Sequence, residues 1–92
     1  MEYKVIILPS AISDLEKLPK SIKTGILRKI KYLSENAEYI IHHRLQNIPQ
    51  DLQGLCRTRF GSYRILYWIY PKKNVIKIYR IAHRSSIYKN IS

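Results

Sequence analysis

The sequence predicts an α+β domain with an N-terminal strand, two helices and a three-stranded antiparallel meander, in which the helices pack on one face of the sheet. Three observations lead to this fold class. The chain opens with a short β-branched segment, apolar residues then recur every three to four positions up to about residue 36, and alternating segments separated by turn residues follow from residue 55. Strands and helices in separate runs are typical of this class. The 92 residues are expected to form one domain, residues 1–92.

The first part of the chain is predicted to form one strand and two helices. Residues 3–8 are short and β-branched, which favours a strand. Ser10 is expected to cap the first helix, with Asp14 in its first turn, and Pro19 is expected to end this helix and open the next one. The second helix is amphipathic and is predicted to end near residues 34–36. Its apolar stripe consists of Ile22, Ile26, Ile30 and Leu33.

The rest of the chain is predicted to form a loop and a three-stranded meander. Residues 37–53 lack periodicity and are expected to be a loop held down by Leu45 and Ile48. Residues 55–60, 63–70 and 75–82 are predicted strands, joined by a Gly-first turn at 61–62 and a Pro-to-Asn turn at 71–74. Residues 83–91 are expected to be a tail with room for one helical turn. Because two helices follow the first strand, it is expected at an edge of the meander or beside its last strand.

The charge is distributed unevenly along the sequence. The net charge is +11, and residues 52–92 contain nine basic residues and no carboxylate side chain, whereas the first 51 residues contain eight basic and six acidic ones. A folded surface that concentrates cations repels itself unless a polyanion binds it. Tyrosines interleave with the arginines, which suits exposed bases and phosphates. The alternative is a solvated basic face with no specific ligand.

Several function classes find no support in the sequence. No apolar run is long enough to span a bilayer, and the N-terminus has no signal-peptide pattern, so a cytoplasmic location is expected.

The single cysteine, Cys56, is expected to point into the core, and Trp68 is also expected in the core. The adjacent His42 and His43 have no cysteine or acidic partner at ligand spacing, so we expect them in a surface loop. Neither a metal nor another cofactor is expected.

A cluster of basic side chains is the candidate site. Alternation places Arg57 and Arg59 on the face of their strand that also carries Leu55, and Cys56, Thr58 and Phe60 on the other face. Further candidates for the same site lie across the hairpin turn and after the last strand; they are Arg64, Arg84 and Tyr88. Four guanidinium groups and a phenol on one sheet face would suit metal-free cleavage of RNA. In that reaction the 2′-hydroxyl attacks the neighbouring phosphate, and fixed arginines stabilise the growing negative charge.

Proton transfer in such a site needs a group other than arginine. Arginine is a poor base because its pKa lies above about 12. Tyr88 or His83 is the better candidate, although Tyr88 could instead stack on a base. Three further cations are expected to contact RNA outside the site: Lys77, Arg80 and Lys89.

The sequence resembles the RelE toxins of the RelE/ParE superfamily along its whole length. The N-terminal match is Ala11-x-x-Asp14-Leu15-x-x-Leu18-Pro19, followed by a basic amphipathic helix. Leu45-Gln46-Asn47 is similar to the family's Leu-x-Gly element, with Asn47 where glycine is usual. The two strongest matches are Arg57-x-Arg59-Phe60-Gly61-x-Tyr63-Arg64-Ile65-x-Tyr67 and His83-Arg84-Ser85-Ser86-Ile87-Tyr88.

The resemblance implies a toxin that enters the ribosomal A site and cuts the mRNA there, and a cognate antitoxin that wraps the toxin and blocks or distorts this face. It carries the family's function onto Arg57, Arg59, Arg64, Arg84 and Tyr88. A basic residue or a histidine is common in the family at the position of His83. One departure is that well-studied relatives have lysines at the positions of Arg57 and Arg59, one of them a proposed base. Either Tyr88 or His83 then replaces that lysine, or electrostatics and alignment of the mRNA by the ribosome do most of the work, or the activity is weak.

Three other interpretations stay open. The ParE branch shares the fold but acts on DNA gyrase, and it generally lacks the converging arginines and the terminal tyrosine. A non-catalytic RNA-binding module could use the same basic, tyrosine-rich sheet. The basic face could also serve mainly to bind an acidic antitoxin, which is compatible with RNA cleavage because both ligands could compete for one face.

Overall fold

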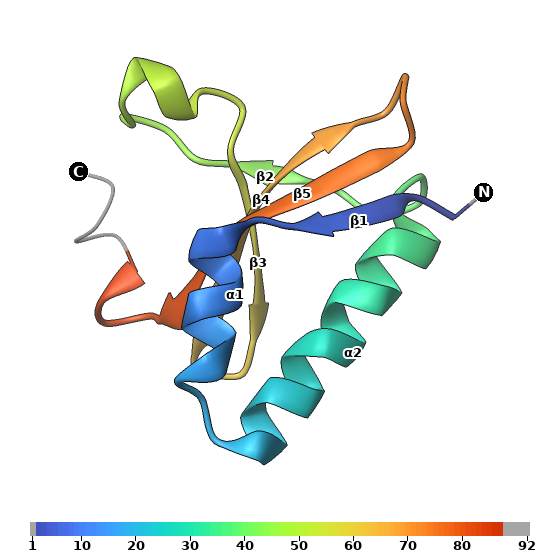
Figure 1. Ribbon diagram of the computed structural model, residues 1–92. Helices are drawn as coiled ribbons and strands as arrows, with labels where there is room; N and C mark the ends of the chain where they lie inside the picture. The colour runs from blue at the N-terminus through green and yellow to red at the C-terminus, as the bar shows by residue number, and fades with distance from the viewer. Residues whose placement is uncertain (1, 88–92) are drawn as a thin grey trace.

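The computed structural model describes residues 2–87, so the predicted site residues Tyr88 and Lys89 lie outside the described residues (Figure 1). The described elements are β1 (Lys4–Ile7), α1 (Pro9–Glu16), α2 (Lys20–Asn36), β2 (His43–Arg44), the 3-10 helix η1 (Gln50–Leu52), β3 (Cys56–Phe60), β4 (Tyr63–Tyr70) and β5 (Val75–His83). The predicted order of a strand, two helices and three antiparallel strands is therefore present. The structure adds β2 and η1 within the segment predicted to be a loop.

The strands form one mixed sheet in the order β1-β5-β4-β3-β2. β3, β4 and β5 form the predicted antiparallel meander, and β2 pairs antiparallel with β3. β1 runs parallel to β5, from the Lys4↔Val75 pair to the Ile7↔Ile78 pair. The first strand was expected at an edge of the meander or beside its last strand, and it lies beside β5 at the edge of the sheet, so this prediction is confirmed. β2 escaped prediction because two residues are too few to show an alternating pattern.

Both predicted turns lie where the sequence places them. Gly61 in the β3–β4 turn has a φ of 57°, and Asn74 in the β4–β5 turn has a φ of 53°. Glycine adopts this left-handed region without steric cost, and asparagine tolerates it better than most residues. These turns fix the register of the meander, which sets the direction of every side chain on β3 and β4.

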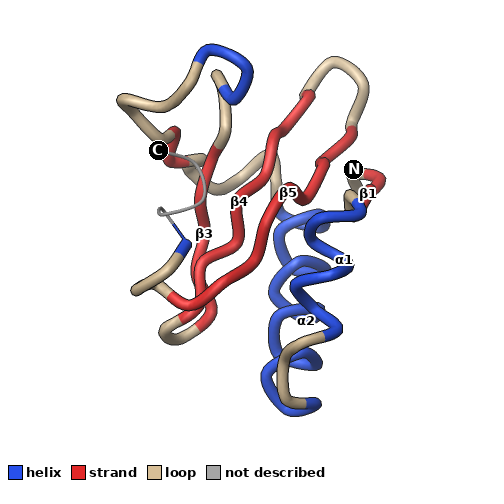
Figure 2. The backbone as a smooth tube through the Cα atoms, turned by 60° about the vertical axis from the view of Figure 1, so that its left-hand side comes forward, coloured by secondary structure: helices blue, strands red, loops and turns tan. Residues whose placement is uncertain are grey.

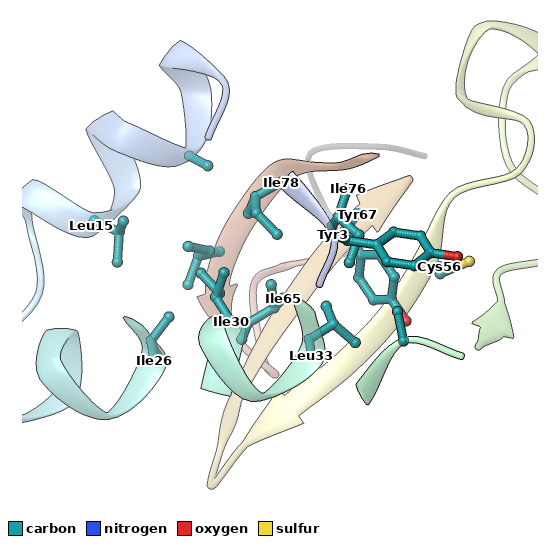
Figure 3. Close-up of a cluster of buried hydrophobic side chains, with 13 residues drawn as sticks. Tyr3, Leu15, Ile26, Ile30, Leu33, Cys56, Ile65, Tyr67, Ile76 and Ile78 are labelled. Atoms are coloured by element: carbon teal, nitrogen blue, oxygen red, sulfur yellow. The ribbon is translucent and has the colours of Figure 1, made fainter. Parts of the chain in front are cut away.

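Two hydrophobic clusters lie on opposite faces of the sheet. On one face, α1 and α2 cover β3, β4 and β5, as Figure 2 shows, and the apolar stripe of α2 packs with Leu15 against Ile65, Ile76 and Ile78 (Figure 3). Cys56 is fully buried in this cluster, as predicted. On the other face, a smaller cluster gathers around Leu66; its further members are Leu52, Leu55 and Ile87, with Leu45, Ile48, Trp68, Tyr79 and Ala82 partly buried against them. The helices thus pack on one face, as expected, while parts of the loop and of the C-terminal segment cover the other.

The start of α1 differs from the prediction. The helix begins at Pro9 with Leu8 as its N-cap, so the expected capping role of Ser10 is wrong, and Asp14 lies beyond the first turn. An N–H group in the first turn of a helix has no partner within the helix, so proline, which lacks this group, is favoured there. Pro9 therefore starts the helix ahead of Ser10. The Ser10 hydroxyl instead donates a hydrogen bond to the carbonyl oxygen of Tyr79 on β5.

Ser10 and Asp14 together cover an open edge of the sheet. The pairing of β1 with β5 ends at Ile78, so the following residues of β5 have no strand partner on that side. Ser10 satisfies the carbonyl of Tyr79, and Asp14 Oδ2 accepts a hydrogen bond of 2.8 Å from the Ile81 N–H. The same carboxylate binds Arg80, with Nε–Oδ2 at 2.9 Å and Nη2–Oδ1 at 3.2 Å. Helix α1 therefore takes the place of a neighbouring strand along the end of β5.

This arrangement makes Asp14 a stability determinant. The Asp14→Ala substitution leaves the Ile81 N–H and the partly buried Arg80 side chain without their acceptor, so we expect it to lower the free energy of unfolding by about 3 kcal/mol. Glu16→Ala, at an exposed position of the same helix, is the matched control and should cost far less. Urea unfolding of both variants checks this, and equal losses would contradict the role of Asp14.

Candidate functional site

The alternation of β3 separates its buried side chains from its cationic ones. Cys56 is fully buried and Thr58 and Phe60 are half-buried, whereas Arg57 and Arg59 are exposed. Phe60 packs against the helix-side cluster, close to the Gly25 Cα of α2, where an added Cβ would come within 2.1 Å of the ring. The buried half of β3 is thus fixed by packing against α2, and this fixes Arg57 and Arg59 on the opposite face.

Arg64 lies directly across the hairpin from Arg59. The two are register partners in the β3–β4 pair, and partners in a sheet project their side chains from the same face. Arg64 Nη1 donates hydrogen bonds to the carbonyl oxygens of Gly61 at 3.2 Å and Tyr63 at 3.3 Å, which hold the guanidinium beside the turn. Like charges in such a pair destabilise the sheet. A bound anion would remove that cost, so the pair suits an anionic ligand.

A pocket of about 440 Å³ lies at this cluster. Its cationic side chains come from three elements: Lys29 from α2, Arg57 and Arg59 from β3, and Arg64 from β4. The segment after α2 also lines the pocket, with Ile41 and with His43 of β2. Four cations around one cavity suit an anionic ligand such as a phosphate group, because arginine can hold a phosphate through two parallel hydrogen bonds.

Arg84 lies at the same end of the sheet as the Arg59–Arg64 pair. Its backbone N–H donates a hydrogen bond of 2.8 Å to the carbonyl oxygen of Ser62 in the β3–β4 turn. The side chain is exposed. The structure therefore brings the Arg84 backbone next to the hairpin that carries Arg59 and Arg64.

His83 lies on the other face of the sheet. It is the register partner of Tyr63, their rings meet edge to face at 5.6 Å, and Tyr63 packs against the helix-side cluster. His83 Nδ1 accepts a hydrogen bond of 3.2 Å from the Ser85 N–H and lies 2.9 Å from the Ser85 hydroxyl. The structure thus does not bring His83 to the arginines, and its lone pair at Nδ1 is already occupied. The sequence missed this because the alternation of β5 is interrupted by a bulge, where Tyr79 has no register partner on β4.

Two of the cations expected to contact RNA lie away from the arginine pocket. Arg80 is paired with Asp14, which ties its side chain to α1. Lys77 is the register partner of Trp68, roughly 13 Å along β4 from Arg64 at about 3.3 Å per residue. Its Nζ lies 5.4 Å from the ring centre of Tyr70. Neither residue belongs to the pocket of Arg57, Arg59 and Arg64.

A buried hydrogen bond holds the segment that carries His43. The side chain of Tyr67 is buried, and burial raises the pKa of its phenol, with repulsion from the Cys56 thiolate as a smaller cause. The phenol therefore stays protonated and donates to His42 Nδ1 at 2.7 Å, while His42 Nε2–H donates to the carbonyl oxygen of Ala37 at 2.8 Å. The expectation of a surface loop at His42 and His43 is thus wrong: His42 is half-buried and holds the chain, and His43 is an exposed residue of β2.

Two further observations bear on the class of protein. Within residues 2–87, no group of three or more His, Cys, Asp or Glu side chains could hold a metal ion. None of the described helices is both long and apolar enough to cross a membrane.

The comparisons with known proteins define the family. The family model described as ParE toxin of type II toxin–antitoxin system, parDE, matches residues 5–88. Toxin RelE of Mycobacterium tuberculosis is 32% identical over 87 residues, which is 95% of this chain and 87% of that protein. The chain therefore belongs to the RelE/ParE superfamily and is the toxin of a type II toxin–antitoxin system.

Solved structures agree with this assignment. The toxin–antitoxin complex RelBE2 of Mycobacterium tuberculosis contains a chain that superimposes with a TM-score of 0.77 at 29% identity, covering 92% of this chain and 94% of that one. The archaeal RelE–RelB complex of Pyrococcus horikoshii OT3 gives a TM-score of 0.69 at 27% identity, covering 91% and 97%. The resemblance to RelE toxins inferred from the sequence is thus confirmed at the level of the superfamily.

The Tyr67–His42 bond leads to a prediction about alkaline stability. Since the pKa of Tyr67 is raised in the folded protein, the unfolded chain loses this proton first, and the stability from this group is lost as the pH rises above about 10. We expect Tyr67→Phe to lower the free energy of unfolding by about 1 kcal/mol at pH 7, through the lost hydrogen bond. Its stability should then fall less steeply above pH 10 than that of the wild type.

Denaturant unfolding of both proteins at several pH values tests this. Tyr39→Phe, at a side chain that is 79% exposed, is the control. Parallel stability curves for Tyr67→Phe and the wild type would contradict the role of the buried phenol.

Proposed function

We propose that this toxin cuts mRNA in the ribosomal A site during translation, without a metal ion, and that its partners are the ribosome, the message and a cognate antitoxin. One observation carries the proposal: the cross-strand pair of Arg59 and Arg64 lies on one sheet face with Arg57, around a single pocket. The RelE names of the relatives support the same activity.

The proposed reaction is an internal transfer at one phosphate. The 2′-hydroxyl attacks the neighbouring phosphorus, the bond to the 5′-oxygen breaks, and the products are a 2′,3′-cyclic phosphate and a 5′-hydroxyl. Negative charge grows on the non-bridging oxygens on the way to the transition state. The guanidinium groups of Arg57, Arg59 and Arg64 stabilise that charge more than they stabilise the bound message, which is the condition for catalysis.

Orientation by the ribosome supplies the rest of the proposed rate enhancement. In-line attack requires the 2′-oxygen, the phosphorus and the 5′-oxygen to be aligned, and a flexible single strand rarely adopts this geometry. Holding reactants in position can account for a large share of a barrier. Arg84 at the hairpin turn and Tyr88, assigned from the family resemblance, complete the proposed site.

A cognate antitoxin is the proposed regulator. The relatives are found in complexes of RelE with RelB, and the net charge of +11 on this chain favours an acidic partner. An acidic segment over the pocket would compete with the phosphates of the message for the same arginines. The antitoxin would thereby block cleavage without any change in the fold of the toxin.

Gyrase inhibition is the second candidate, because the matching family model bears the name ParE. The two activities differ in what they require. Cleavage needs the converging arginines, whereas binding to gyrase needs only a complementary surface. An intact message in cells that the toxin still poisons would favour gyrase.

Primer extension on a message translated in a purified system tests the proposal. We expect cuts at codon-spaced positions that require ribosomes, and we expect Arg59→Ala to slow them by roughly 10²-fold, the usual cost of removing one preorganised donor to the transition state. Lys73→Ala removes an exposed cation in the distant β4–β5 turn and should cut normally. Equal cutting by both variants would contradict the assigned site.

A further inference from the structure

The pocket of the arginines contains one described side chain of a type that serves in general acid–base catalysis. Arginine and lysine stay protonated near neutral pH, and the phenol of Tyr67 is buried and already donates to His42. The remaining ionisable side chain that lines the pocket is His43. Histidine changes its charge between about pH 5 and 8, so it can accept or donate a proton under physiological conditions.

The register of β2 places His43 beside the arginines. His43 is the direct partner of Arg57 in the antiparallel β2–β3 pair, so both side chains project from the same face. Partners of this kind have Cβ atoms about 5 Å apart. His43 therefore lies next to the arginines of the proposed phosphate site.

The three histidines differ in what binds their rings. Both ring nitrogens of His42 are hydrogen-bonded, and Nδ1 of His83 accepts from Ser85 on the other face of the sheet. The exposed imidazole of His43 has no hydrogen-bond partner among residues 2–87. Its backbone is nevertheless fixed, because β2 pairs with β3 and the neighbouring His42 is tied to Tyr67. A fixed backbone with an accessible ring is what a proton-transfer residue requires.

From this geometry we propose that His43 is the catalytic base of the cleavage reaction, an inference that rests on the proposed function. The neutral imidazole takes the proton of the 2′-hydroxyl as the 2′-oxygen bonds to phosphorus. The bond from phosphorus to the 5′-oxygen breaks, and the 5′-oxygen takes a proton from water. The imidazolium then returns its proton to the solvent, so the cycle consumes neither protons nor electrons. His43 supplies the proton acceptor that the arginines at positions 57 and 59 cannot.

The test is single-turnover cleavage on programmed ribosomes by the full-length toxin, its His43→Ala and His43→Gln variants, and Lys72→Ala as a matched surface control. Positioned proton transfer contributes roughly 10² to 10⁴ in rate, so both His43 variants should cleave at least about 100-fold more slowly. Binding to ribosomes, measured by co-sedimentation, should not change. Because His43 is exposed, the variants should fold, which urea unfolding verifies.

Rescue of the cleavage rate by added imidazole separates a catalytic role of His43 from a purely structural one. Imidazole should restore part of the cleavage rate of His43→Ala, because a small base can enter the space left by the ring, and it should not restore Arg59→Ala. Cleavage by His43→Ala close to the wild-type rate would overturn the role of His43 and leave the proposed function intact. A loss of rate matched by lost ribosome binding, or not restored by imidazole, would also overturn it. A wild-type toxin that leaves the message intact would overturn both.

Discussion

The two-residue alternation of β3 and β4 beneath two helices is the constraint on which the site depends. Ile65 and Tyr67 face the helices, and the alternate residues Arg64 and Leu66 face the other side. A shift of one residue in this pairing would turn arginines into the core and isoleucines into water. The free energy of burying the core therefore also fixes the direction of the arginines. The strand pairing alone therefore holds the three arginines of the proposed site on one face.

Helix α1 makes the second contribution, through polar contacts at the edge of the sheet. Ser10 and Asp14 bond to backbone groups of β5 beyond the end of β1, where an exposed edge would otherwise attract other strands. The same carboxylate neutralises Arg80. Asp14 thus covers the edge of the sheet and also pairs with Arg80. The cations of the pocket come instead from α2, β3 and β4.

Most of the fold could be predicted from the sequence because it follows from local patterns. The alternation of residues 55–60, the Gly61 turn and the apolar stripe of α2 each depend on residues close together in the chain. The features that escaped prediction depend on distant contacts. β2 exists only because β3 offers it a pairing edge, and Ser10 bonds to Tyr79 rather than to its own helix. The bulge at Tyr79 changes the alternation of β5, which is why the position of His83 could not be read from the sequence.

The candidate site was likewise predictable only where its residues lie close together in the chain. Arg57, Arg59 and Arg64 were found because they lie on one hairpin, whereas His43 reaches them only through a two-residue strand. Two features of the sequence nevertheless bear on His43. His42 and His43 are adjacent, so in an extended chain they must point to opposite faces, one into the core and one toward the arginines. The absence of a lysine at positions 57 and 59 also left a proton acceptor to be found elsewhere.

In the proposed reaction the 2′-hydroxyl of the message itself attacks the phosphate held by the arginines. The most direct measurement is cleavage of a translated mRNA that carries one 2′-deoxynucleotide immediately 5′ of a mapped cut. We expect this cut to disappear while the neighbouring cuts remain, and the remaining products to end in a 2′,3′-cyclic phosphate. A cut at the deoxy position as frequent as in the unmodified message would rule out attack by the 2′-hydroxyl, because the attacking oxygen would then have to come from water.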